Sequence, residues 1–86
     1  MKENELKERF KELLRSYVKV EDIQLDRTLD EMGMDSFAGV HLLVDLESEF
    51  EIEFPDYMIN SEMFKDGNSI YKCFYDVMKM NDKVLD

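Results

Sequence analysis

The stretch that decides the fold is MGMDSFAGVHLLVDLESEFEIEFPD, residues 32–56. Its apolar side chains recur at the three- and four-residue spacing of an α-helix, which predicts one long helix. Gly33 lets the backbone bend before this helix, and Pro55 cannot continue it. We therefore predict that the helix lies between these two residues and ends at about Glu51.

The helix opens with an Asp-Ser pair, and its serine has three interpretations. Asp35 or Ser36 can act as the N-cap, because a side-chain oxygen at that position accepts a free backbone N–H. A serine nucleophile would need a G-x-S-x-G turn and a nearby base, but the single histidine, His41, lies on the same helix at a spacing where side chains diverge. An attachment point is the third interpretation, because a phosphodiester on Ser36 would meet free N–H groups at the positive end of the helix. We expect no catalytic residue, and we expect His41 to face solvent.

This helix carries more apolar surface than a small bundle can bury. One broad face, which can fill a core, consists of Leu42, Leu43, Leu46 and Phe50. A second apolar strip beside it consists of Phe37, Val40 and Val44, with Glu47 at its border. An exposed apolar strip rimmed by acids indicates a protein docking site. The alternative is that this is the central helix of the fold, buried nearly all round.

Two further helices flank the central one. Residues 4–18 form an amphipathic pattern whose apolar members are Leu6, Phe10, Leu13, Leu14 and Tyr17. The last helix spans about residues 69–80, with an apolar stripe of Ile70, Phe74, Val77 and Met78. The tripeptide Gly67-Asn68-Ser69 predicts a turn followed by a helix cap.

Irregular segments connect these helices. The apolar residues of the segment 19–35 are spaced too irregularly for one helix, so we predict a long loop with one turn near residues 29–32. Residues 56–68 are also irregular, with a short turn from Ser61 to Phe64. The predicted fold is an all-α bundle of three to four helices, with a long loop between the first and the second.

Length and charge restrict the function further. The chain has 86 residues, which predicts one domain over residues 1–86 with its core at about 4–80. A chain of this size buries only about 60% of its unfolded surface, which leaves no room for a deep substrate pocket. The formal net charge of −10 arises from 21 acids and 11 bases. Such a surface repels nucleic acid and attracts basic protein surfaces, although acidity can also serve solubility alone.

Several other site types are not supported. Cys73 is the single cysteine, so no disulfide forms within the chain, and we expect a cytoplasmic monomer. The N-terminus is charged from its second residue, unlike a signal peptide, and no apolar run approaches the about 20 residues of a membrane span. The string DRTLDEMGMDSF, which starts at Asp26, lacks the glycine and the final glutamate of an EF-hand, so we expect no metal site.

The string from Gly33 to Asp56 resembles the acyl carrier protein family, which includes the peptidyl carriers. The family pattern is a Gly-x-Asp-Ser-Leu core, an apolar helix with Leu-Glu and Phe, and an Ile/Val-Pro exit, and it aligns here without a gap. The matching residues are Gly33-Met34-Asp35-Ser36-Phe37, Leu42, Leu46-Glu47, Phe50, Ile52 and Pro55-Asp56. A weaker match extends over about residues 4–80.

This resemblance implies a non-catalytic carrier. It implies that a phosphopantetheinyl transferase uses coenzyme A to esterify Ser36 through phosphate to 4′-phosphopantetheine, with Asp35 part of the modification site. The thiol of that arm would hold acyl or aminoacyl groups as thioesters. The implied partners are an acyl- or aminoacyl-loading ligase and downstream transferases or synthases with basic docking surfaces. The implied docking residues are Phe37, Val40, Val44 and Glu47.

Some residues depart from the family pattern. Phe37 stands where leucine is usual, as in the D-alanyl carriers, and residues 57–65 lack the usual acidic run after the proline. His41 and Ser48 stand where fatty-acid carriers often have acids. We therefore expect a discrete acyl or aminoacyl carrier of a specialised pathway, such as polyketide, non-ribosomal peptide or aminoacyl transfer. The alternatives are a fatty-acid synthase acyl carrier protein and a carrier-like interaction module without the arm.

Overall fold

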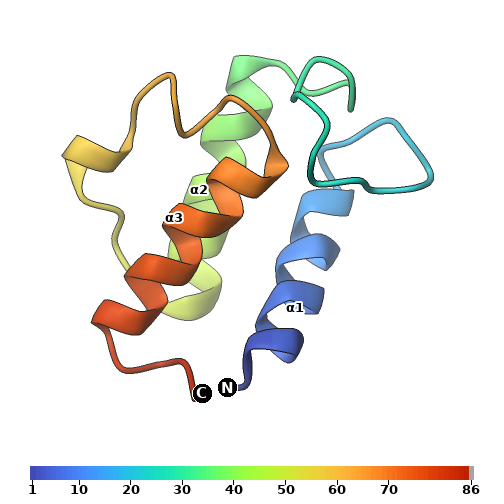
Figure 1. The fold of residues 1–86 in the computed structure, drawn as a ribbon. Helices are drawn as coiled ribbons and strands as arrows, with labels where there is room; N and C mark the ends of the chain where they lie inside the picture. Colours follow the sequence, from blue (N-terminus) through green and yellow to red (C-terminus); the bar gives the residue numbers. More distant parts are fainter. Residues whose placement is uncertain (86) are drawn as a thin grey trace.

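The computed structural model describes residues 1–85 and contains the three helices predicted from the sequence (Figure 1). In chain order the elements are α1 (Glu3–Arg15), α2 (Ser36–Phe50), the 3₁₀ helix η1 (Asp56–Met58) and α3 (Gly67–Met80). Over residues 1–85, β pairing is limited to isolated bridges, so this part of the chain contains no strand. The all-α class is confirmed, and η1 takes the place of any fourth α-helix in the described chain.

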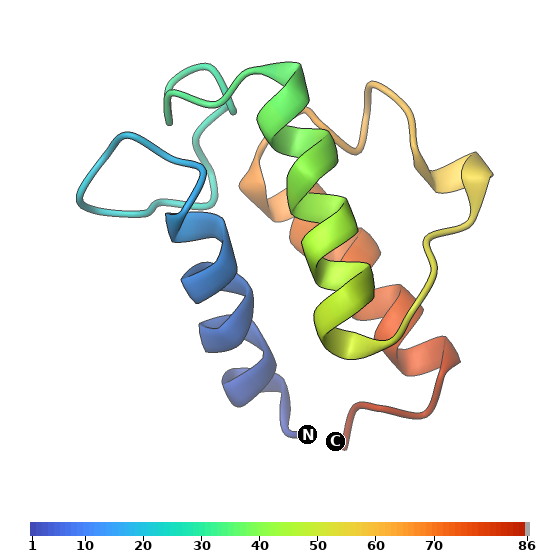
Figure 2. The ribbon, with the colours of Figure 1, turned by 180° about the vertical axis from the view of Figure 1, so that it is seen from behind.

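An aromatic cluster joins the three α-helices, which lie side by side in Figures 1 and 2. Phe10 of α1 stacks on Phe74 of α3 with a centroid distance of 5.6 Å, and Phe50 of α2 meets Phe74 edge-on at 5.0 Å. The fully buried aliphatic side chains around this cluster include Leu6, Leu14, Leu42, Leu46, Ile70 and Val77. The helix faces predicted to fill the core therefore do so.

The helix α1 ends at Arg15, earlier than the predicted end at residue 18. The backbone N–H of Tyr17 donates to the carbonyl of Leu14 at 2.9 Å in a tightened last turn. The hydroxyl of Tyr17 donates to the carboxylate of Asp45 in the middle of α2. A tertiary contact with α2 thus holds Tyr17 outside the helix that its spacing predicted.

The connection from residue 16 to residue 35 contains the predicted turn. Thr28 and Glu31 form a capping box, in which the N–H of Thr28 donates to Glu31 Oε1 at 2.9 Å and the N–H of Glu31 donates to Thr28 Oγ1 at 3.1 Å. The hydrogen bond from the backbone N–H of Thr28, with that from the Thr28 side chain and the charge of Arg27, lowers the pKa of the Glu31 carboxyl. The buried side chains that pin the connection to the core are Leu25, Leu29, Met32 and Met34.

The helix α3 begins at Gly67, so the predicted cap at Ser69 is wrong. The cap is Asp66, whose Oδ1 accepts a hydrogen bond from the N–H of Ser69 at 2.8 Å. A Cβ at Gly67 would lie 3.0 Å from the Cα of Leu25, so the close approach of these two backbones requires glycine. The start of α3 is therefore set by its contact with the first connection.

The segment between α2 and α3 contains more regular secondary structure than the sequence predicted. The 3₁₀ helix η1 follows Pro55 directly, and the N–H of Met58 donates to the carbonyl of Pro55 at 3.0 Å. The predicted turn at residues 61–64 follows, with the N–H of Met63 donating to the carbonyl of Asn60 at 3.1 Å. This segment returns the chain from the C-terminal end of α2 to the N-terminal end of α3 (Figure 2).

Candidate functional site

Ser36 is the first residue of α2, and its side chain is exposed. Asp35 precedes it in an extended conformation, and Asp35 Oδ1 accepts a hydrogen bond from the N–H of Ala38 at 2.8 Å. The cap is therefore Asp35, one of the two predicted candidates, and capping does not need the hydroxyl of Ser36. That hydroxyl stands at the N-terminus of a helix whose first N–H groups have no intrahelical acceptor.

The backbone that leads into Ser36 is held in place by the first connection. Gly33 has a φ of +78°, and a Cβ there would lie 2.9 Å from the Cβ of Lys19. The N–H of Lys19 donates to the carbonyl of Met32 at 2.9 Å, and the N–H of Met34 donates to that of Leu29 at 2.9 Å. The predicted bend at Gly33 is confirmed, and it sets the direction in which α2 starts.

The apolar strip on α2 lies at the surface. Phe37 is 75% exposed, Val44 is 54% exposed and Val40 is 48% exposed. On the other face of α2, the predicted core residues Leu42, Leu43, Leu46 and Phe50 are buried. The alternative of a helix buried nearly all round is therefore wrong, because the bundle covers only one face of α2.

Two acids of α2, Glu47 at the border of the strip and Asp45, have intramolecular partners. Glu47 is half-buried, and its Oε2 accepts a hydrogen bond from the N–H of Phe54 at 2.9 Å. Asp45 accepts from the hydroxyl of Tyr17, and this hydrogen bond, with burial and the charge of Asp45, raises the pKa of Tyr17. His41 is exposed, as predicted. The carboxylate of Glu47 thus holds the chain beyond α2 in addition to any contact with a partner.

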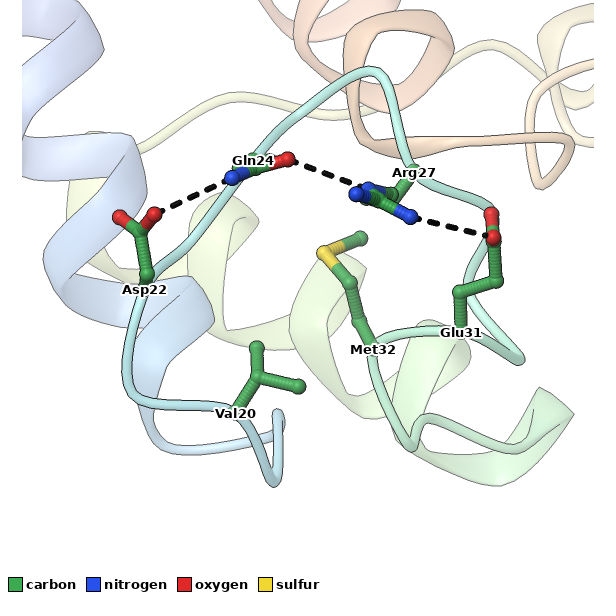
Figure 3. Close-up of a pocket in the computed structure, with 6 residues that line it drawn as sticks. All are labelled: Val20, Asp22, Gln24, Arg27, Glu31 and Met32. Carbon is green, nitrogen blue, oxygen red and sulfur yellow. Dashed lines mark hydrogen bonds and ion pairs between the residues drawn. The ribbon is translucent and has the colours of Figure 1, made fainter.

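Two surface cavities lie away from α2. One of about 220 Å³ lies in the first connection, where Gln24 binds Asp22 and Arg27 through 3.1 Å hydrogen bonds and Arg27 pairs with Glu31 (Figure 3). The other, of about 430 Å³, lies between α3 and the segment that contains η1 and the turn after it, and its lining includes Met58, Met63 and Cys73. Burial, with the charge of Asp76, raises the pKa of the Cys73 thiol, which keeps it protonated and a poor nucleophile.

Along residues 1–85, no helix combines the length and the apolar character that crossing a membrane requires. In the same part of the chain, no three His, Cys, Asp or Glu side chains gather where they could hold a metal ion.

Sequence reasoning missed one contact beside the site. Gly39 of α2 is buried under the ring of Phe64, which comes from the segment before α3. A glycine inside an otherwise regular helical pattern is the signal that could have indicated a close approach there. The partner of Gly39 could not be deduced, because Phe64 lies in a segment without periodicity.

Comparison with known proteins defines the class. A family model described as the phosphopantetheine attachment site matches residues 4–63, and the chain therefore belongs to this family. The match contains α2 and confirms the resemblance seen between Gly33 and Asp56. The prosthetic group of the family is 4′-phosphopantetheine, and the family is one of carrier proteins.

One relative is similar to part of this chain. An aminoacyl carrier protein from Agrobacterium fabrum (strain C58 / ATCC 33970) is 40% identical to this chain over 45 residues. The matched stretch is 52% of this chain and 54% of that protein, so the chain spans about half the length of its relative.

The start of α2 suits a phosphodiester. The exposed hydroxyl of Ser36 is accessible, and the free N–H groups and positive end of α2 favour the negative charge that a phosphodiester brings. The side chain of Asp35 is already committed to Ala38, so its carboxylate points at the first turn of the helix. These features fit the prosthetic group of the family.

Proposed function

We propose that this chain is an acyl or aminoacyl carrier and that Ser36 is the residue to which phosphopantetheine is attached. The observation that carries the proposal is the exposed hydroxyl of Ser36 in the first turn of α2, within the residues that match the family model. The bound group supplies a thiol on a flexible arm, which holds an acyl group as a thioester. The chain itself orients this arm and presents it to enzymes.

The attachment step balances as a phosphoryl transfer. The new bond joins Ser36 Oγ to the phosphorus next to the pantetheine part of coenzyme A. The bond that breaks lies within the pyrophosphate of coenzyme A, and the adenosine part leaves as its 3′,5′-bisphosphate. The hydroxyl proton passes to a base of the transferase. Asp35 holds the first turn of α2 in position during this step through its bond to Ala38.

The strip of Phe37, Val40 and Val44 supports docking to partner enzymes. These side chains lie on the same helix as Ser36, and they are exposed. The net charge of −10 favours encounter with basic partner surfaces, such as those of a phosphopantetheinyl transferase, a loading ligase and downstream transferases. Attachment through the arm raises the effective concentration of the cargo at each partner.

The proposal favours an aminoacyl or other specialised cargo over a fatty-acid synthase role. The relative from Agrobacterium fabrum is an aminoacyl carrier protein. His41 and Ser48 are exposed on α2, and neither carries the negative charge that fatty-acid carriers often have at these positions. A partner enzyme that binds acidic side chains at both positions would lack those two contacts with this chain.

The intact mass of the chain tests the attachment. We expect one added arm after incubation with a promiscuous phosphopantetheinyl transferase and coenzyme A, and no addition to Ser36→Ala. Ser48→Ala is the matched control, because Ser48 is also an exposed serine of α2. A folded chain that gains no arm would support an adaptor module that uses the same strip, and an arm on Ser36→Ala would place the attachment elsewhere.

A further inference from the structure

One turn beyond Ser36, Gly39 presents bare backbone to the ring of Phe64. A Cβ at Gly39 would lie 3.0 Å from Cδ1 and 3.1 Å from Cε1 of that ring, and 3.8 Å from a methyl group of Leu29. Carbon atoms pack best at about 3.5–4.0 Å, so the ring occupies space that any larger side chain at this position would need. Gly39 is buried and Phe64 is half-buried. The aromatic ring is thus seated directly on the helix backbone.

This contact lies on the buried side of Ser36. At about 100° per residue, Gly39 lies about 60° from Ser36 in one direction, and Val40 of the exposed strip lies about 40° from it in the other. Leu43, which lies nearly below Ser36 on the same helix, is only 4% exposed. Phe64 therefore covers the side of α2 through which a group attached to Ser36 would enter the bundle.

The boundary between α2 and the segment 51–66, here called the seam, is held by a further contact. Further along α2, Glu47 Oε2 binds the N–H of Phe54 at 2.9 Å, which ties the segment to the helix. Met63, next to Phe64 in the chain, is 2% exposed, and it borders the larger cavity together with residues of α3. The two cavities described above are lined by residues of the first connection or of the 57–76 region, and neither lining includes a residue of α2.

We propose that Phe64, seated on Gly39, seals the bundle beside Ser36 and keeps a thioester-linked cargo outside the core. This inference rests on the proposed function and specifies its cargo. A short polar acyl group, such as an aminoacyl group, loses nothing by staying in water. A long apolar chain would remain hydrated and gain no protection from the bundle. The closed seam therefore matches the carrier to short or polar acyl groups.

The melting temperature of the loaded carrier tests this inference. The wild type and Phe64→Ala are each modified at Ser36 and loaded with either an octanoyl or an alanyl group. In the wild type, we expect the two loaded forms to melt within about 1 °C of each other, whereas in Phe64→Ala the octanoyl form should melt about 4 °C or more above the alanyl form. Tyr75→Ala is the control, because Tyr75 is a half-buried aromatic of α3 that packs near Tyr71, away from the seam. It should show no difference between the two cargoes.

A second measurement separates this inference from the carrier function. Free n-octanol is added to the unmodified chain, and the amide NMR signals of Gly39 and Leu43 are followed. We expect shifts in Phe64→Ala and none in the wild type, and this comparison does not require the arm. Phe64→Val serves in both experiments if Phe64→Ala fails to fold. An octanoyl-dependent rise in the wild type overturns the proposal, as does the absence of both effects in the folded Phe64 variant.

Discussion

The ammonium group of Lys83 donates hydrogen bonds to the carbonyl oxygen of Phe50 at 2.6 Å and to that of Glu51 at 3.1 Å. These carbonyls lie at the C-terminal end of α2, where backbone acceptors have no intrahelical donor. Glu51 adopts a left-handed conformation with a φ of 54°, and the positive charge of Lys83 also complements the negative end of the helix. A residue from the far end of the chain therefore completes the helix that carries the candidate site.

Replacing Lys83 should destabilise the fold. For Lys83→Met we expect a loss of about 1 kcal/mol in the free energy of unfolding, because two acceptors lose a charged donor but remain near solvent. This corresponds to a melting temperature lower by about 4–8 °C, measured by circular dichroism. Lys65→Met is the control, because Lys65 is an exposed lysine outside the helices. Equal melting temperatures for the two variants would show that the bonds from Lys83 contribute nothing.

Two substitutions of Asp35 should distinguish its effect on stability from its effect on the modification of Ser36. Asp35→Ala removes the acceptor for the N–H of Ala38 and should cost about 1 kcal/mol of stability, whereas Asp35→Asn keeps an acceptor oxygen and should cost less. Denaturant unfolding measures this difference. Because Asn lacks the charge, we expect both variants to accept the arm more slowly in the mass assay. Equal destabilisation of the two would show that the charge, rather than the cap, is what stabilises α2.

Val44→Arg should weaken docking while the fold remains intact. Val44 is 54% exposed, so an arginine can extend into solvent, but on the proposed docking strip it removes an apolar contact and repels a basic partner. We expect a rate of arm transfer about tenfold lower at limiting carrier concentration, which corresponds to a loss of about 1.4 kcal/mol. The control is Val20→Arg on the first connection, where Val20 is 36% exposed. Loss of the helical circular dichroism signal in Val44→Arg would mean that this face belongs to the core.

Tyr71 should make the protein less stable at high pH. Burial, with the charge of Glu3 and the neighbouring Tyr75, raises the pKa of Tyr71 to about 12. Its hydroxyl is buried, and among residues 1–85 it has no hydrogen-bond partner. The unfolded chain releases this proton near pH 10, whereas the folded chain keeps it until about pH 12. The free energy of unfolding should therefore be unaffected by this group below pH 10 and should fall as the pH rises from 10 toward 12.

Tyr71→Phe tests both properties of this hydroxyl. The variant should be more stable at neutral pH by about 1 kcal/mol, because an unpaired polar group leaves the interior. Its stability should also fall less between pH 10 and 12, with the raised pKa of Tyr17 accounting for part of the remaining decline. Urea unfolding across this range measures both effects. Tyr57→Phe, at a 67% exposed tyrosine, should change neither property.

Local patterns along the chain were enough to predict much of this protein. The spacing of apolar side chains predicted all three α-helices and the core face of α2, because helical periodicity is a property of the sequence itself. The string from Gly33 to Asp56 predicted the family, because its residues resemble the family pattern without a gap. Residue spacing also identified Ser36 as a candidate, because the start of a helix is a local feature.

The tertiary structure decided what depends on residues far apart in the chain. It showed that the strip with Phe37 is exposed, because periodicity defines the faces of a helix but not which of them a neighbour covers. It brought Tyr17 to Asp45, Phe64 to Gly39 and Lys83 to Phe50. Each of these contacts joins α2 to a residue outside the three α-helices, so its geometry exists only when the helices pack and bring the two segments together.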